Sequence, residues 1–300
     1  MGLNLATMLR ESARTHPHRV ALRLDDAVLG YADLDAAADR FAAGLRRHGI
    51  RPGDAVALQL PNVPQFAIAH FGILKAGAVV VPVNVLLKAR EVAYVLSDSG
   101  ARTLVTWGGV AAEAAKGAAD AGVTDLVVLG DPGDVAALPF DALLAHDDGP
   151  ILEPRDPGDV AVIVYTAGTT GTPKGAELTH FQLFMNADTP GRLFGIRDDD
   201  IVLVALPLFH VYALSSQLHL CVRFAATMTL MPRFDAGRAL EVIERDRVTV
   251  FEGVPTMYVA LLEHPDRERR DTSSLRVAIS GGAPRSRPRC STPSSASSAW

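Results

Sequence analysis

The chain has 300 residues, of which 48% are apolar and 21% are charged, and this composition favours a globular protein with a sizeable core. Lysine and arginine total 29 against 34 aspartates and glutamates, so the net charge is −5, which argues against nucleic acid as a partner. Two cysteines exclude a disulfide-rich scaffold, and the nine histidines show no metal-ligand spacing. Without a visible signal peptide or transmembrane segment, the sequence predicts a cytoplasmic protein.

Helical and strand patterns alternate along most of the chain. From Asp33 the apolar residues recur at helical spacing, with Asp33 as the predicted N-cap and Gly49 as the stop. Further helices are predicted at 64–77, 90–98, 111–121, 181–189, 213–221, 236–246 and 256–263, and strands at 55–60, 78–83, 102–106, 125–129, 160–165, 201–206, 226–231, 248–251 and 275–280. A looser stretch, 130–157, is predicted to wrap the surface. This alternation indicates an α/β fold with mostly parallel sheets flanked by helices.

Residues 285–300 depart from this pattern, because they are rich in serine, arginine and proline and contain no acidic residue. One interpretation is a natural flexible tail. The other is a frameshift, since codons for the run from Pro284 can be chosen so that a shifted frame encodes an amphipathic helix. Sequencing the gene through the codon for Pro284 distinguishes the two.

The segment with the clearest chemistry is 165–175, Tyr-Thr-Ala-Gly-Thr-Thr-Gly-Thr-Pro-Lys-Gly, between a predicted strand and the helix near 181. Its glycines allow several backbone N–H groups to surround phosphate oxygens. The hydroxyls of Thr166, Thr169 and Thr170 and the ammonium of Lys174 add charge-assisted hydrogen bonds. A solvated loop is the alternative. The segment is not a Walker A loop, which requires Gly-Lys-Ser/Thr in succession.

This loop closely resembles the signature of the adenylate-forming superfamily, which includes acyl-CoA synthetases, peptide-synthetase adenylation domains and firefly-type luciferases. Other segments are similar to further motifs of the family: 71–78 and 81–84 to N-terminal landmarks, 205–212 (Ala-Leu-Pro-Leu-Phe-His-Val-Tyr) to the second core motif, 252–258 to the substrate-pocket segment, and 280–284 (Ser-Gly-Gly-Ala-Pro) to the turn against adenine. The resemblance spans about residues 3–284, and the fatty-acid–CoA ligase branch is the most similar.

The resemblance implies a two-step ligase that uses ATP, Mg²⁺ and, as co-substrate, CoA. A carboxylate, here expected to be a fatty acid, attacks the α-phosphate of ATP, and the CoA thiol then displaces AMP from the acyl-adenylate. The family's roles fall on these positions: Thr166, Gly168, Thr169, Thr170, Gly171 and Lys174 on the phosphates, Thr170 also on Mg²⁺, Lys174 and His210 in catalysis, Gly281, Gly282 and Ala283 beside adenine, and Gly253, Val254 and Met257 in the acyl pocket.

Each assignment has a plainer alternative. In isolation, His210 between Phe209 and Val211 reads as a partly buried core histidine, and Met257 suits a core as well as a pocket. Cys221 reads as a small buried hydrophobe. Ala167 stands where the family commonly has serine, so one hydroxyl of the phosphate network is missing.

Several elements of the family have no counterpart after Pro284: the aromatic-Gly-x-Thr-Glu motif, the ribose-binding aspartate, the hinge and the C-terminal lid with its catalytic lysine. We therefore expect an incomplete AMP-binding N-terminal domain at 1–284, a non-family tail at 285–300, no lid domain, and little or no ligase activity. A separately encoded C-terminal half could complete the enzyme. The alternatives are a non-catalytic nucleotide-binding remnant and an adenylation domain for another carboxylic acid. An amino acid substrate is less well supported, because 213–215 lacks the aspartate that would hold its amino group.

Overall fold

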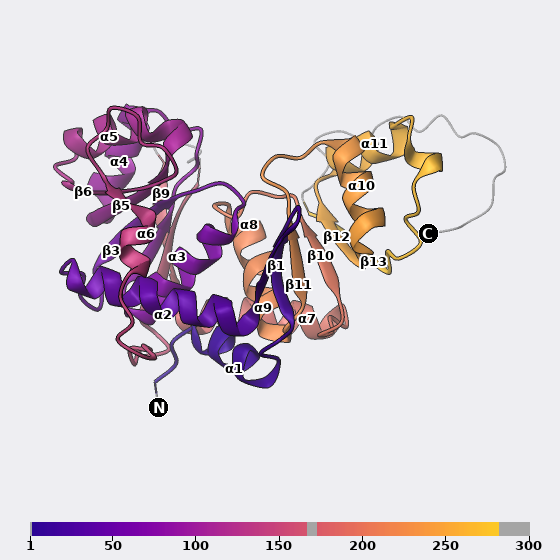
Figure 1. The fold of residues 1–300 in the computed structure, drawn as a ribbon, viewed down its shortest axis with the longest axis horizontal. Helices are drawn as coiled ribbons and strands as arrows, with labels where there is room; N and C mark the ends of the chain where they lie inside the picture. The colour runs from indigo at the N-terminus through magenta and orange to yellow at the C-terminus, as the bar shows by residue number, and fades with distance from the viewer. Residues whose placement is uncertain (1, 167–172, 282–300) are drawn as a thin grey trace.

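The computed structural model describes residues 2–166 and 173–281. Two β-sheets with helices on their faces lie side by side, the first on the left of Figure 1 and the second in the centre and on the right. The α/β fold with mostly parallel sheets, predicted from the alternation of patterns, is confirmed. No helix in the described part of the chain is both long and apolar enough to cross a membrane.

The first sheet has seven strands within the described residues, and all neighbouring strands are parallel except the last pair, β8 and β9. Its central strands β3 and β4 are fully buried, which explains why both are almost entirely apolar, with Gln59 at the end of β3 as the exception. In spatial order the strands are β7 (Leu138–Pro139), β6 (Asp125–Leu129), β5 (Ala101–Trp107), β3 (Ala55–Gln59), β4 (Val79–Pro82), β8 (Val160–Thr166) and β9 (Lys174–Thr179).

Helices cover both faces of this first sheet. Val56 and Leu58 of β3 belong to the core that includes α2 and α3, whereas Ala55 and Ala57 belong to the core that includes α4 and α5. This division follows from the alternation of side chains along a strand. The helices are α2 (Tyr31–Arg47), α3 (Pro64–Lys75), α4 (Ala89–Ser99), the 3₁₀ turn Gly108–Val110, α5 (Ala111–Asp120) and α6 (Phe140–Leu144), the last within the stretch predicted to be looser.

The second sheet has six strands in the described chain, parallel except for the pair β1 and β2. In spatial order they are β13 (Val277–Ser280), β12 (Val250–Gly253), β10 (Ile201–Val204), β11 (Thr227–Leu230), β1 (Val20–Leu24) and β2 (Ala27–Gly30). Its helices are α1 (Thr7–Thr15), α7 (His180–Leu193), α8 (Val211–Ala213), α9 (Leu220–Phe224), α10 (Ala236–Asp246) and α11 (Pro255–Glu263), with a π-helical turn at Leu214–His219 and a 3₁₀ turn at Arg267–Arg269. Nothing in the sequence analysis predicted α1, β1 or β2.

The predicted start of the helix at 33–49 was wrong, because α2 begins at Tyr31 with Gly30 as its N-cap. Strand β2 runs directly into this helix, and Tyr31 is buried with its hydroxyl donating to the carbonyl of Ala226 at 2.7 Å. Asp33 lies in the first turn, where its carboxylate still meets the positive end of the helix dipole. The predicted stop is confirmed, since Gly49 follows the helix at φ +85°.

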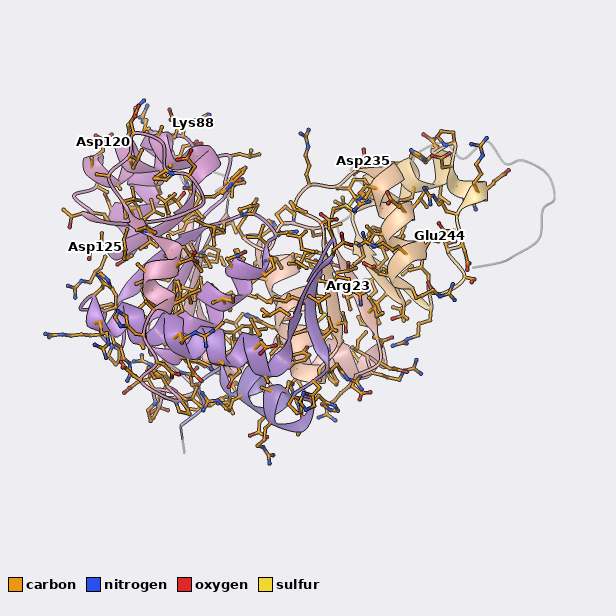
Figure 2. All side chains as sticks on the ribbon, in the orientation of Figure 1. Arg23, Lys88, Asp120, Asp125, Asp235 and Glu244 are labelled. Carbon is orange, nitrogen blue, oxygen red and sulfur yellow. The ribbon has the colours of Figure 1, made fainter. Side chains whose placement is uncertain are left out.

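Charged side chains of both signs project from both parts of the molecule, including Lys88 and Asp120 near the first sheet and Glu244 on α10 (Figure 2). Arg23 of β1 forms an ion pair with Asp246 of α10 at 3.1 Å. Asp246 is almost fully buried and therefore fixes the N-terminal strand to a helix far away in the sequence.

A buried histidine pair connects α3 with the π-helical turn. The Nε2 atoms of His70 and His219 lie 2.8 Å apart, and both residues are fully buried. Burial lowers the pKa of both imidazoles, that of His219 to about 3. The pair is therefore neutral at pH 7, with one Nε2–H donating to the other Nε2.

Candidate active site

The predicted phosphate loop connects two strands of a hairpin. Strand β8 ends at Thr166, β9 begins at Lys174, and these two residues are directly opposite each other. The predicted strand–helix junction was therefore wrong, and α7 begins only at His180. Strand β9 was missed because its first four residues are all exposed, so it lacks the alternation that identifies a half-buried strand. Among the predicted phosphate ligands, Gly168, Thr169, Thr170 and Gly171 lie outside the described residues.

Thr166 and Lys174 are exposed at the carboxyl end of β8. None of residues 2–166 and 173–281 forms an ion pair with Lys174, so its ammonium is available to an anionic ligand there. Helix α4 contacts the residue that precedes β9, because the hydroxyl of Tyr94 donates to the carbonyl of Pro173 at 2.7 Å. The hydroxyl of Tyr165 donates to Asp98 of the same helix, also at 2.7 Å.

The other predicted site segments meet at the carboxyl edge of the second sheet. Strands β10, β12 and β13 are neighbours there: residues 205–210 follow β10, Gly253 ends β12 and Gly281 follows β13. The N–H of Gly281 donates to the carbonyl of Gly253 at 2.9 Å. A Cβ atom on Gly281 would lie 2.5 Å from the ring of Tyr212, so a side chain here would require that ring to move. Open parallel sheets bind ligands at such carboxyl edges. Gly282 and Ala283 lie beyond the described residues.

His210 is exposed and is the N-cap of α8, so the interpretation as a partly buried core histidine was wrong. Its Nδ1 accepts a hydrogen bond from the N–H of Tyr212 at 3.3 Å. From this contact we assign the hydrogen of the neutral ring to Nε2. The Nε2–H group can then donate to an oxygen of a bound carboxylate or phosphate.

Asn62 holds the segment that carries His210, and the sequence analysis missed it. It follows β3 and is 2% exposed. Its Nδ2 donates to the carbonyls of Leu206 at 2.9 Å and Met231 at 3.1 Å, and its Oδ1 accepts from the N–H of Leu208 at 2.9 Å. The amide therefore joins the carboxyl end of β3 in the first sheet to the carboxyl ends of β10 and β11 in the second. In the sequence, Pro-Asn after a strand signals only a turn.

The predicted acyl-pocket residues lie at and after the end of β12. Gly253 is buried, and Val254 and Met257 are half-buried against the core. Tyr258, one residue further, donates from its hydroxyl to the carbonyl of Ile279 at 2.8 Å and is a structural residue. The interpretation of Cys221 as a buried hydrophobe is confirmed, since it is fully buried.

Glu252 lies in the segment 252–258 that resembles the substrate-pocket motif, but the sequence analysis gave it no role. It is 1% exposed, and Ser216 donates from Oγ to its Oε2 at 2.6 Å. Burial raises the pKa of this carboxyl to about 7, and the hydrogen bond from Ser216 opposes the shift. The signal that could have revealed it is one charged residue within an otherwise apolar strand.

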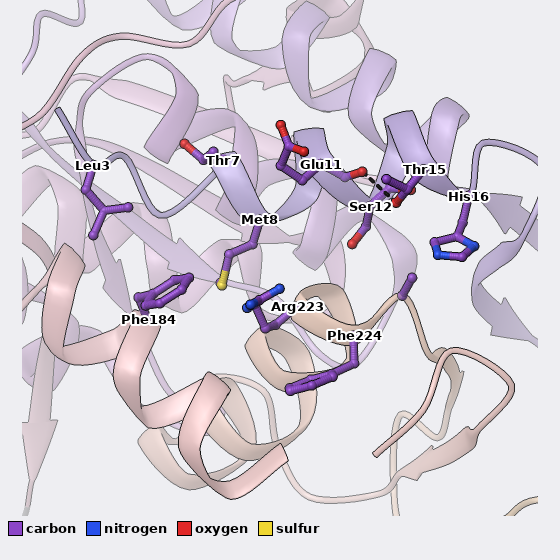
Figure 3. A pocket seen from close by; sticks show the side chains of 11 residues that line it. Leu3, Thr7, Met8, Glu11, Ser12, Thr15, His16, Phe184, Arg223 and Phe224 are labelled. Atoms are coloured by element: carbon purple, nitrogen blue, oxygen red, sulfur yellow. Dashed lines mark hydrogen bonds between the residues drawn. The ribbon is translucent and has the colours of Figure 1, made fainter. Parts of the chain in front are cut away.

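A groove of about 520 Å³ lies between α1, α7 and α9, with Met8, Phe184, Arg223 and Phe224 in its lining (Figure 3). Its lining residues His16 and Ala225 precede β1 and β11, so it opens at the amino edge of the second sheet. The predicted site residues of that sheet lie at its carboxyl edge. This groove is therefore not the predicted site.

No three histidine, cysteine or acidic side chains converge as metal ligands in residues 2–166 and 173–281. Mg²⁺ at nucleotide sites is held by one or two carboxylates together with phosphates and water. Thr170, the predicted magnesium ligand, lies outside the described residues. We therefore assign no protein ligand to Mg²⁺.

The family model described as AMP-binding enzyme matches residues 9–291. The chain belongs to the AMP-binding enzyme family. The resemblance noted in the sequence is thereby confirmed. A feruloyl-CoA synthase from Amycolatopsis sp is 39% identical over 91% of this chain and 53% of its own length. A long-chain-fatty-acid–CoA ligase from Bacillus subtilis (strain 168) is 30% identical over 93% of this chain and 55% of its own. A 4-coumarate–CoA ligase from Humulus lupulus is 34% identical over 86% and 48%.

Solved structures agree with this assignment. The anthranilate CoA ligase AuaEII in complex with anthranoyl-AMP superposes with a TM-score of 0.89 at 26% identity, over 93% of this chain and 55% of that one. The N-terminal domain of FACL13 from Mycobacterium tuberculosis gives 0.86 at 31% identity, over 94% and 70%. The relatives are acid–thiol ligases, and the chain spans about half the length of the curated ones that it matches.

Proposed function

We propose that this chain supplies the ATP-binding and acid-binding part of an AMP-forming carboxylate–CoA ligase. In the first half-reaction, a carboxylate oxygen attacks the α-phosphorus of ATP and the bond to pyrophosphate breaks. In the second, the sulfur of CoA attacks the acyl carbon and AMP leaves. The observation that supports this proposal most is the meeting of the His210, Gly253 and Gly281 segments at one sheet edge, which Asn62 ties to the first sheet.

The described residues have distinct roles in this proposal. The ammonium of Lys174 and the hydroxyl of Thr166 bind phosphate oxygens, together with the residues of the loop between them, and stabilise the charge that develops on pyrophosphate. The Nε2–H of His210 orients the carboxylate and later the adenylate. In this proposal adenine binds beside Gly281, and the resemblance assigns Gly282 and Ala283 to the same role. Mg²⁺, when bound, neutralises phosphate charge.

The identity of the acid has two candidates. A fatty acid is supported by the half-buried apolar side chains of Val254 and Met257 and by the similarity to the Bacillus subtilis ligase. A phenylpropenoic acid is supported by the similarity to feruloyl-CoA and 4-coumarate–CoA ligases. Gly253, Val254 and Met257 line the pocket in both cases.

The matched relatives are about twice as long as this chain. We therefore infer that the complete reaction also needs the part of the relatives that this chain does not match, in the same polypeptide or as a separate one. We place the enzyme in the cytoplasm, where ATP and CoA are available.

Isothermal titration of MgATP into the 300-residue chain tests the site. We expect binding that is at least tenfold weaker in Lys174→Ala, because one charge-assisted contact to phosphate is lost. Lys116→Ala is the matched control, since Lys116 is exposed on α5. Equal affinity of wild type and Lys174→Ala would refute the phosphate role. Carboxylate-dependent release of pyrophosphate then tests catalysis, and binding without release favours the non-catalytic alternative.

A further inference from the structure

The side chain of Ser216 lies between two oxygen atoms that compete for its hydrogen. Its Oγ is 2.6 Å from Oε2 of Glu252 and 2.9 Å from the carbonyl oxygen of Tyr212, four residues earlier in the same helical segment. A serine hydroxyl carries one hydrogen, so it can donate to only one of these oxygens at a time. An ionised Glu252 therefore leaves one contact without a hydrogen. A protonated Glu252 donates to Ser216, and Ser216 then donates to Tyr212, so that both contacts are hydrogen bonds.

The surroundings of Glu252 favour the protonated form. The residue is 1% exposed, and no salt bridge within residues 2–166 and 173–281 includes it. The titratable side chains around it are Tyr212 of α8, Cys221 of α9 and Tyr258 of α11, whose pKa values are raised by burial and by the charge of Glu252. These three groups are therefore neutral at pH 7 and supply no positive charge. Burial raises the pKa of the Glu252 carboxyl to about 7.

The hydrogen bond from Ser216 to Tyr212 acts on the part of the site that lies beside Gly281. The ring of Tyr212 packs against Gly281, and Ser216 belongs to the π-helical turn Leu214–His219. A serine that donates to the carbonyl four residues earlier bends its helix, and π-helical turns occur frequently at functional sites. When Glu252 releases its proton to water, the hydrogen of Ser216 turns to the carboxylate and the bond to Tyr212 is lost. The position of the Tyr212 ring therefore depends on the proton of Glu252.

We propose that Glu252 is a positioning residue: as a neutral donor it directs the Ser216 hydroxyl to Tyr212, whose ring is thereby held beside Gly281 for nucleotide binding. This inference rests on the proposed function, in which adenine binds beside Gly281. The form with neutral Glu252 has the complete chain of hydrogen bonds and is the form that binds MgATP. The apparent affinity then follows the neutral fraction. With a pKa of about 7, this fraction falls from about nine tenths at pH 6 to about one tenth at pH 8.

Isothermal titration of MgATP into the 300-residue chain at about pH 6 and about pH 8 tests this inference. Between these values we expect wild type to lose about tenfold more affinity than Glu252→Gln, whose side-chain amide donates to Ser216 at both. Other titrating groups, including those of the nucleotide, contribute equally to the two proteins. Ser216→Ala should bind weakly at both pH values, and Ser216→Thr, which keeps the hydroxyl, should restore the pH dependence. The exposed Glu263 of α11 provides the control, and Glu263→Gln should behave as wild type.

The outcomes separate the two proposals. Equal pH dependence of wild type and Glu252→Gln overturns the role of Glu252 and leaves the ligase proposal standing. Absence of binding to wild type at both pH values overturns the proposed nucleotide site and this inference with it. If Glu252→Gln does not fold, Ser216→Ala decides: a pH dependence equal to that of wild type counts against the inference. Infrared difference spectra of wild type give a readout without ligand, and a protonated carboxyl should be present at about pH 6 and lost at about pH 8.

Discussion

Replacing Asn62 by alanine should strongly destabilise the protein. The change removes the acceptor for the N–H of Leu208 and the donors to the carbonyls of Leu206 and Met231. All three of these residues are at most 5% exposed, so water cannot easily replace the lost partners. At about 1–3 kcal/mol for each of these three unpaired buried groups, the free energy of unfolding should fall by about 3–9 kcal/mol. That is a large fraction of the roughly 5–15 kcal/mol that stabilises a typical domain.

Urea unfolding measures this loss as a lower midpoint with an unchanged slope. The exposed Asn186 of α7 provides the control, and Asn186→Ala should change the free energy of unfolding by less than about 0.5 kcal/mol. Asn62→Ala should also weaken binding of MgATP, because the segment with His210 loses its support. A loss of stability below about 1 kcal/mol would show that these hydrogen bonds do not hold the two sheets together.

Two further predictions concern the histidine pair and the loop. Because burial lowers the pKa of His70 and His219, the unfolded chain binds more protons than the folded chain below pH 6.5. The free energy of unfolding should therefore fall by up to about 1.4 kcal/mol per pH unit for each histidine as the pH drops from 6.5 to 5. His219→Gln should remove about half of this slope between pH 6.5 and 5 in urea unfolding, and an unchanged slope would contradict the assignment. Tyr94→Phe loses the hydrogen bond to Pro173, worth about 1 kcal/mol, and should weaken MgATP binding about fivefold in titration calorimetry, whereas unchanged affinity would show that this contact does not position Lys174.

The buried parallel strands and the helices between them could be predicted well, because the apolar pattern of each lies within a few consecutive residues. Strands β3 and β4 are apolar except for Gln59 at the end of β3, and α10 lies at the predicted residues 236–246. Strand β9 was not predictable, because an exposed edge strand carries no periodic signal. Strand β1 is short, and it exists because it pairs with β11, about 200 residues later in the chain.

The residues of the candidate site also fall into two groups, those that a local motif reveals and those that only the fold reveals. Lys174 and His210 stand in motifs whose residues are adjacent in the sequence, so a resemblance could find them. Asn62 and Glu252 act through partners 144 and 36 residues away, for example Leu206 and Ser216. Only the folded chain shows that Asn62 holds the segment before His210 and that the Glu252 carboxyl accepts a hydrogen bond from Ser216.

The position of β1 in the second sheet has a consequence for how the protein folds during synthesis. Leu22 is fully buried opposite Met228 of β11, so its partner leaves the ribosome about 200 residues later. At roughly 5–20 residues per second, the N-terminal hairpin waits on the order of 10–40 s with its apolar face uncovered. Chaperones that hold short apolar segments are therefore expected to act on residues 20–30 of the nascent chain. Slower translation should lengthen this exposure and lower the soluble yield.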